Sequence, residues 1–304
     1  MATYTEEQLD RYLKHIRFPQ VHVRRDVSRD PLGFLTALQV HHMARVPFES
    51  LSLHYSKHRL LSLDPEDLFE KIVESGRGGY CMEVNTLFAA VLRSLGYTLY
   101  SAGARVKGPN GYKGWDHMVN IVTIGSTRYL VDVGFGSNGS ASPQPLDNDR
   151  EFDAVPPVVG RLQYRKLDEH TDPNQRAWLY SVKENEDAPW KDMYSFVETE
   201  FMPGDFEVMN LRTMTTPQSF FVQSVMCIRT IPDAAMKKPI GWLILYRDYV
   251  KKRVGSESKI IEQLENEEQR VEALERHFGI VLSEVEKKGI RGLSSELRPK
   301  GGHA

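Results

Sequence analysis

A cysteine that follows two glycines is the residue of this sequence best suited to nucleophilic chemistry. In the run RGGYC at 77–81 the glycines allow a tight turn, and a helix is predicted to begin directly afterwards, over about 82–95. The positive end of that helix dipole would favour a thiolate on Cys81, which is the nucleophilic form. The ordinary alternative is a buried, inert thiol, and Cys227 in the apolar run FFVQSVMCIRTI fits that alternative well.

A predicted hairpin downstream carries a histidine and an aspartate. The runs HMVNIVTI at 117–124 and RYLVDVGF at 128–135 are rich in β-branched and aromatic residues, as strands are. Gly125 and Ser126 between them suit a two-residue type II′ turn.

The register of this hairpin decides whether the two polar residues can meet. If Ile124 faces Thr127, His117 becomes the diagonal same-face neighbour of Asp132, at roughly 7–8 Å between backbones. A three-residue loop would instead turn them to opposite faces. In the first register Asp132 would orient the imidazole and His117 would accept the thiol proton, so that the three residues act as a nucleophile, a base and an orienting acid.

The elements expected to carry the cysteine are helices. Thr5 with Gln8 forms a capping-box pattern, and Asp30 and Asp64 each precede a proline at a first helical position. Apolar residues at helical spacing follow each cap. Residues 1–97 are therefore predicted to form a helical unit.

Beyond residue 97 the apolar period shortens towards two, which is typical of strands. Strands are expected at 98–107, 117–124, 128–135, 161–167, 177–184, 220–231 and 242–249. The acidic, proline-containing stretches at 147–157 and 168–176 are expected to be exposed loops. A final helix is predicted at about 256–278, with a frayed end over 293–304.

The composition argues against several classes of function. The 304 residues include 39 Lys and Arg against 41 Asp and Glu, so the basic excess that nucleic-acid binding requires is missing. Two cysteines are too few for a disulfide framework or a four-thiolate zinc site, and no metal is expected. No stretch approaches the roughly 20 apolar residues that span a bilayer, and the N-terminus lacks a signal-peptide pattern. We therefore expect a cytoplasmic protein without nucleic-acid or membrane partners.

Several segments closely resemble the motifs of the arylamine N-acetyltransferases. RGGYCMEVN at 77–85 resembles the family signature RGGxCx(E/Q)xN, and VPFESL at 46–51 resembles the upstream PFENL segment. Further resemblances, in the family's order, are DVGFG at 132–136, YSF at 194–196, DFE at 205–207 and the N, TP, S, F pattern across 210–220. The resemblance covers about residues 3–280.

This resemblance implies an α+β fold with a papain- or transglutaminase-like Cys-His-Asp core. The family's helical bundle, central β-barrel and C-terminal α/β lid would correspond to residues 1–97, 98–208 and 209–304. The bundle would carry the cysteine, and the barrel would carry the histidine and the aspartate.

The resemblance also implies an enzyme that transfers an acyl group by a ping-pong mechanism, with Cys81, His117 and Asp132 as catalytic triad. Acetyl-CoA would acylate Cys81, and an aromatic amine or hydrazine would then take the acyl group, in the service of xenobiotic detoxification. The overall pattern looks nearest to fungal members, some of which use malonyl-CoA. Malonyl-CoA is therefore the alternative donor.

Binding residues are carried over from the family at matching positions. Those expected to contact CoA are Lys113, Gly114, Arg212, Thr216 and Gln218. Those expected to line the pocket for the arylamine are Phe48, Tyr80, Val106 and Phe135. Arg77 is expected to play a structural, ion-pairing part.

Two rival interpretations stay open. A cysteine hydrolase or a transglutaminase-like enzyme would use the same triad, with water or a protein amine accepting the acyl group. A catalytically inactive binding module would retain the fold of the family but not its activity. The tail after about residue 285 does not resemble the C-terminal segment of vertebrate members, which leaves the geometry of the lid open.

Overall fold

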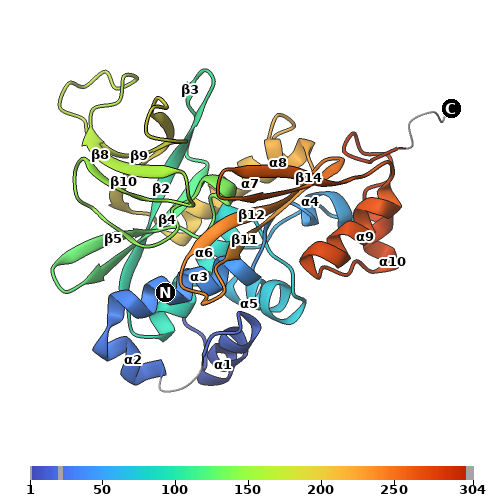
Figure 1. The fold of residues 1–304 in the computed structure, drawn as a ribbon, viewed down its shortest axis with the longest axis horizontal. Coiled ribbons are helices and arrows are strands. Elements are labelled where there is room, and N and C mark those ends of the chain that lie inside the picture. The colour runs from blue at the N-terminus through green and yellow to red at the C-terminus, as the bar shows by residue number, and fades with distance from the viewer. Residues whose placement is uncertain (1, 20–22, 299–304) are drawn as a thin grey trace.

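The chain combines N-terminal helices, a barrel-like sheet and a second sheet accompanied by C-terminal helices (Figure 1). The computed structural model describes residues 2–19 and 23–298. Every helix in those ranges is too short or too polar to span a bilayer.

Helices build most of the first third of the chain, as predicted. They are α1 (Glu6–His15), α2 (Val23–Arg29), α3 (Pro31–Arg45), α4 (Ser52–Tyr55), α5 (Pro65–Phe69), the single π-helical turn η1 (Glu70–Glu74) and α6 (Cys81–Ser94). The predicted caps at Thr5, Asp30 and Asp64 are all present. Helix α6 lies inside the main hydrophobic cluster, where Leu87 and Phe88 are fully buried.

The larger sheet is antiparallel and strongly curled (Figure 1). Its strand order is β6-β5-β4-β2-β10-β9-β8-β7, and β3 pairs with β2. The strands are β2 (Thr98–Gly108), β3 (Gly111–Tyr112), β4 (His117–Ile124), β5 (Thr127–Val131), β6 (Gln144–Pro145), β7 (Arg150–Asp153), β8 (Val159–Arg165), β9 (Ala177–Lys183) and β10 (Lys191–Glu200); a 3-10 turn η2 (Gly136–Asn138) precedes β6. Aromatic side chains such as Tyr180, Tyr194 and Phe196 fill the core of this sheet.

The smaller sheet pairs one short strand from the first third of the chain with four strands from the last third. Its strand order is β1-β11-β12-β13-β14, and the strands are β1 (Phe48–Glu49), β11 (Met226–Pro232), β12 (Pro239–Tyr246), β13 (Tyr249–Val254) and β14 (Glu257–Gln263). The accompanying helices are α7 (Pro203–Thr215), α8 (Phe220–Gln223), α9 (Glu267–Phe278) and α10 (Glu284–Gly289). Because β1 belongs to this sheet, residues 1–97 are not purely helical.

The predicted register of the β4–β5 hairpin is confirmed. Ile124 pairs with Thr127, and the pairing continues to Asn120 with Val131. Gly125 has a φ of 61°, as the first central position of a type II′ turn requires. The strand predicted at 128–135 ends at Val131, because the following residues leave the sheet towards α6 and the N–H of Val133 bonds to an α6 side chain.

Other sequence expectations need correction. The helix predicted at 256–278 is wrong in its first half, where β14 pairs with β13 across the two-residue turn at Gly255 and Ser256. The strand predicted at 220–231 begins with the helical turn α8, and the loop predicted at 147–157 contains β7. Strand β10 and helix α7 were not predicted.

The expectation of a frayed C-terminus is wrong for residues 293–298. Leu293 and Leu297 pack against a hydrophobic cluster, and the backbone carbonyl of Ser295 accepts a hydrogen bond from Arg270 at 2.8 Å. Residues 299–304 lie outside the described residues.

Candidate active site

Cys81 is the first residue of α6, as the sequence predicts, and it is 2% exposed. The extended backbone of Tyr80 leads into the helix, and the N–H of Tyr80 donates to the side chain of Glu83 at 3.0 Å. The sulfur lies 3.7 Å from the backbone oxygen of Asp116, to which the thiol donates. The chain thus presents a cysteine at a helix N-terminus, where the dipole stabilises negative charge.

His117 and Asp132 form a buried pair beside this cysteine. Nε2 of His117 lies 2.7 Å from Oδ2 of Asp132, and each residue is 1% exposed. The predicted β4–β5 register is observed as far as Asn120 and Val131, and Asp132 follows directly after the last paired residue. With Nε2 bonded to the carboxylate, Nδ1 is the ring nitrogen left free of Asp132, and Cys81 is among the groups that raise the pKa of His117.

Asn85 fixes the carboxylate from α6. Its Nδ2 donates to Oδ1 of Asp132 at 3.0 Å and to the backbone oxygen of Met118 at 2.9 Å. Its Oδ1 accepts from the N–H of Val133 at 3.1 Å, and the N–H of Gly134 adds a bond to Oδ1 of Asp132 at 2.8 Å. The helix that bears the cysteine therefore also positions the acid.

The electrostatics of the pair favour an imidazolium next to a carboxylate. Burial lowers the pKa of His117, but the charge and hydrogen bond of Asp132, helped by Cys81, outweigh it and raise the pKa from 6.5 to about 10. Burial raises the pKa of Asp132, but His117, Asn85 and the N–H of Gly134 bring it below its ordinary value. Both groups therefore stay charged at neutral pH.

Of the four residues predicted for the amine pocket, Phe135 is the one that an aromatic contact places against His117. The ring of Phe135 packs edge-on against His117 at 5.0 Å between centroids. Phe48 and Tyr80 both contact the ring of Phe221, at 5.8 and 5.2 Å. Val106 lies on β2, where its N–H donates to Oδ1 of Asp116 at 2.9 Å.

Three of the five residues predicted to contact CoA come together. Nζ of Lys113 lies 3.9 Å from Oδ2 of Asp116, and a Cβ built on Gly114 would lie 3.9 Å from Nη1 of Arg212. Arg212 is also among the charges that act on the pKa of Asp116, which burial raises overall. Thr216 bonds to the carbonyl of Arg212 at the end of α7, whereas no contact joins Gln218 to this group in the described part of the chain.

Several contributors were missed by the sequence interpretation. Gln39 donates to the backbone oxygens of Asp132 and Ser140, at 3.4 and 3.2 Å, from a fully buried position on α3. The ring of Tyr194 packs on His117 at 4.9 Å. Gln39 belongs to no motif noted in the sequence, whereas Tyr194 begins the YSF segment, to which the resemblance assigned no role at the site.

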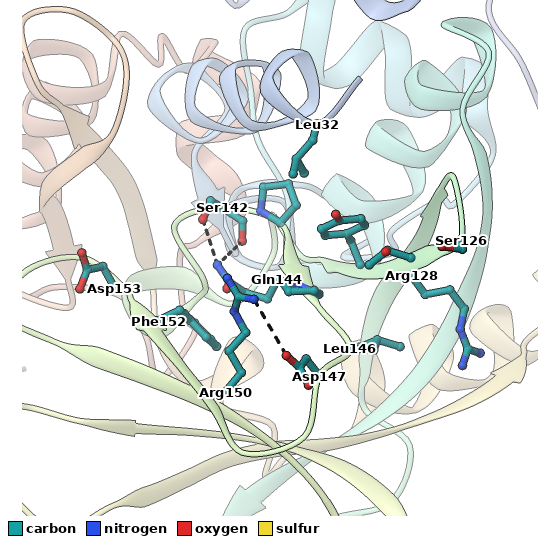
Figure 2. A pocket seen from close by; sticks show the side chains of 14 residues that line it. Leu32, Ser126, Arg128, Ser142, Gln144, Leu146, Asp147, Arg150, Phe152 and Asp153 are labelled. Atoms are coloured by element: carbon teal, nitrogen blue, oxygen red, sulfur yellow. Dashed lines mark hydrogen bonds and ion pairs between the residues drawn. The ribbon is translucent and has the colours of Figure 1, made fainter. Parts of the chain in front are cut away.

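Two clefts lie outside the triad. One, of about 760 Å³, runs along α6 and α7, and its lining includes Met118 and Phe206 from the hydrophobic cluster that also contains Cys81. The other, of about 790 Å³, lies at the outer edge of the larger sheet, where Figure 2 shows Arg150 facing Asp147. Neither cleft is lined by a residue predicted to be catalytic or substrate-binding.

The arrangement suits covalent catalysis by a thiol. A buried cysteine, a charged imidazole and a carboxylate that bonds to it lie together at a helix N-terminus. No group of three or more potential metal ligands occurs in the described residues. The catalytic roles of Cys81, His117 and Asp132 stay predictions.

Known proteins resemble this chain over almost its whole length. A family model described as N-acetyltransferase matches residues 31–287. The chain is 38% identical over 316 aligned residues to N-malonyltransferase FDB2 of Fusarium pseudograminearum (strain CS3096), with 94% of this chain and 92% of that protein covered.

Solved structures resemble it as well. The arylamine N-acetyltransferase from Mycobacterium abscessus superposes with a TM-score of 0.78 at 25% identity, with 93% of each chain covered. The Mycobacterium marinum arylamine N-acetyltransferase in complex with CoA gives a TM-score of 0.76 at 25% identity, with 93% of this chain and 97% of that chain covered.

Proposed function

Because the chain belongs to the arylamine N-acetyltransferase family, we propose that it transfers an acyl group from an acyl-CoA to an aromatic amine through a thioester on Cys81. The observation that carries this proposal is the hydrogen-bonded pair of His117 and Asp132 beside a cysteine at a helix N-terminus. Aryl hydrazines belong to the same acceptor class, since they present a similar ring and nucleophilic nitrogen.

The first half-reaction forms the acyl-enzyme. The thiolate of Cys81 attacks the thioester carbonyl, a new carbon–sulfur bond forms, and the bond to the sulfur of CoA breaks. The departing CoA takes the proton of the His117 imidazolium and leaves as a free thiol. The developing oxyanion needs hydrogen-bond donors, and the backbone N–H of Cys81 is a candidate because the first N–H groups of a helix have no partner within it.

The second half-reaction restores the starting state. The nitrogen of the amine attacks the acyl carbon, and the neutral imidazole accepts its proton. The bond to Cys81 breaks, which returns the thiolate beside the imidazolium. Asp132 stabilises that imidazolium and holds the ring, and the aromatic walls formed by Phe48 and Phe135 suit a flat aryl substrate.

We favour malonyl-CoA over acetyl-CoA as the donor. The relative named N-malonyltransferase covers 94% of this chain at 38% identity, which is higher than the 25% identity of the two arylamine N-acetyltransferase structures. Lys113 and Arg212 supply two cations next to Asp116, whose backbone oxygen contacts the sulfur of Cys81. These cations are candidates for binding the phosphates of CoA and the carboxylate of a malonyl group.

The site is closed around the sulfur, so binding of an acyl-CoA must displace a covering side chain. Phe221 on α8 is a candidate, since it contacts both Phe48 and Tyr80 and belongs to a helix of a single turn. A cytoplasmic place of action and a role in the detoxification of foreign amines belong to the same proposal and rest on the family resemblance.

The proposal is tested by single-turnover acylation. The protein is mixed with malonyl-, acetyl- or propionyl-CoA without amine, and the mass of the peptide that contains Cys81 is followed with time. We expect malonyl transfer to be fastest, and we expect aniline-type amines to discharge the acyl-enzyme. Rapid discharge by water alone would identify a hydrolase, and no acylation of Cys81 by any of the three donors would exclude the proposed function.

A further inference from the structure

The segment after β14 packs back against the loop that precedes Cys81. Nη1 of Arg77 donates to Oε1 of Glu286 at 2.6 Å, although the two residues are 209 positions apart. Arg77 begins the RGGYC run, and Glu286 lies on α10. This ion pair therefore links the C-terminal helix to the approach to the nucleophile.

Arg77 depends on Glu286 for its strongest interaction. The side chain of Arg77 is 9% exposed, and its Nε and Nη2 atoms have no hydrogen-bond partner among the described residues. The carboxylate of Glu49 stands 3.7 Å from Nε, which is an ion-pair distance but too long for a hydrogen bond. Without Glu286 a buried guanidinium would keep only this weaker neighbour, and leaving a buried charge poorly paired is costly.

Helix α10 is itself firmly placed, so it can act as an anchor. Ser283 and Glu286 form a capping box, with the N–H of Ser283 donating to Oε2 of Glu286 at 2.8 Å. A Cβ on Gly289 would lie 2.5 Å from the backbone oxygen of Tyr55, which shows how closely α10 approaches α4. Beyond α10, Oγ of Ser295 bonds to Nδ1 of His54 at 2.8 Å. Figure 1 shows α9 and α10 at the same end of the molecule as α4.

Arg77 is connected to Cys81 through a tightly held stretch of backbone. Gly78 donates its N–H to Oε1 of Glu49 at 3.2 Å, the oxygen that also faces Arg77. A Cβ on Gly78 would lie 1.8 Å from the backbone oxygen of Pro47, so the loop packs directly against the segment that leads into β1. A displaced Arg77 would therefore move the loop on which the position of the sulfur depends.

We propose that Glu286 is a positioning residue for the transfer reaction: through Arg77 it holds the loop 77–80 so that Cys81 faces His117. The inference rests on the proposed role of Cys81 as the nucleophile. The C-terminal segment thus contributes to catalysis without touching a substrate. The sequence after residue 285, which does not resemble that of vertebrate members, would serve to position Cys81.

The test compares Glu286→Gln with Glu286→Asp and with Glu284→Gln. Glu284 lies on the same helix and pairs with Lys287 at 2.7 Å on the surface, so its replacement controls for the loss of a carboxylate on α10. Each variant is treated with iodoacetamide at a temperature well below its unfolding midpoint, and alkylation of Cys81 is followed by mass spectrometry. The rate of acylation by acyl-CoA is measured in parallel.

We expect Glu286→Gln to slow both reactions of Cys81 by about tenfold, since small displacements of reacting groups have effects of this size or larger. Glu286→Asp should recover part of the rate, and Glu284→Gln should match the wild type. A loss of thermal stability with unchanged rates would overturn the proposal and leave the pair with a purely structural role. If the wild-type Cys81 is itself slow towards iodoacetamide, the proposed function fails rather than the role of Glu286 alone.

Discussion

Oδ2 of Asp132 accepts a hydrogen bond from Nε2 of His117 at 2.7 Å, and this contact decides which ring nitrogen faces the cysteine. The acid occupies the nitrogen remote from the sulfur, so the other nitrogen is available to exchange a proton with Cys81. The pair is buried, and its geometry is held by Asn85 on the helix that begins with Cys81.

Replacement of this acid by its amide should disable the enzyme. In Asp132→Asn the charge that raises the pKa of His117 is lost while burial, which lowers it, persists. The imidazole should then be neutral at neutral pH and adopt the wrong tautomer. We expect single-turnover acylation to fall by roughly 10³- to 10⁴-fold, as in other triads. The exposed Asp147→Asn serves as control, and histidine NMR of both variants reports the protonation state; a persistent imidazolium in Asp132→Asn would contradict this account.

The two cysteines should differ sharply in reactivity. Cys81 pairs with a charged imidazole, whereas burial and the charge of Glu49 raise the pKa of the Cys227 thiol well above its usual value. Iodoacetamide at neutral pH should therefore modify Cys81 and spare Cys227 until the protein unfolds. Cys81→Ser should abolish transfer with an unchanged circular dichroism spectrum, and Cys227→Ser should retain activity. Equal labelling of both thiols in the folded protein would contradict this prediction.

Gly134 should tolerate no side chain. A Cβ at this position would lie 2.7 Å from Cα of Cys81 and 2.7 Å from Nδ2 of Asn85. Gly134→Ala should therefore push Asp132 away from α6, lower the free energy of unfolding by about 1–3 kcal/mol and reduce acylation. Gly204→Ala is the matched control, since nothing lies within 4 Å of its Cβ. Urea unfolding and single-turnover rates measure both effects, and equal behaviour of the two variants would refute the predicted clash.

The pH dependence of stability should show a maximum near the ordinary pKa of histidine. His117, with its pKa raised to about 10, contributes stability that is fully present below pH 6.5 and is lost as the pH rises towards 10. Burial lowers the pKa of His42 to about 3 and that of His54 to about 4, so the unfolded chain binds more protons and stability falls as the pH drops below 6.5.

Urea unfolding between about pH 5 and pH 9 measures this curve. His117→Gln should flatten the decline on the alkaline side and leave the acid side in place. A stability that is constant across this range in the wild type would show that the three histidines do not titrate as their surroundings require.

Local patterns predict the β4–β5 hairpin, which begins with His117 and leads to Asp132, but they do not predict the similar turn further along the chain. Gly125 and Ser126 were interpreted as a two-residue turn, and the register followed from it. Gly255 and Ser256 form the same kind of turn between β13 and β14, but the sequence interpretation places a helix over 256–278, where Ile260 and Ile261 lie on β14. On this edge strand the two side chains are 51% and 41% exposed, so burial could not have shaped the pattern.

Contacts between distant segments could not be predicted from spacing. The pairing of Arg77 with Glu286 and the bond from Gln39 to Asp132 join residues that no periodicity relates. The ion-pairing character of Arg77 was expected, but its partner depends on how α10 packs against α4. Such contacts follow from tertiary packing and therefore become visible only in the structure.

The distance along the chain between Arg77 and Glu286 has a consequence for biosynthesis. The ribosome synthesises Cys81, His117 and Asp132 long before Glu286. A nascent chain would therefore contain Cys81 without the ion pair between Arg77 and Glu286. Chains arrested at residue 280 should react more slowly with iodoacetamide than released protein, which would delay acyl transfer until synthesis has passed α10.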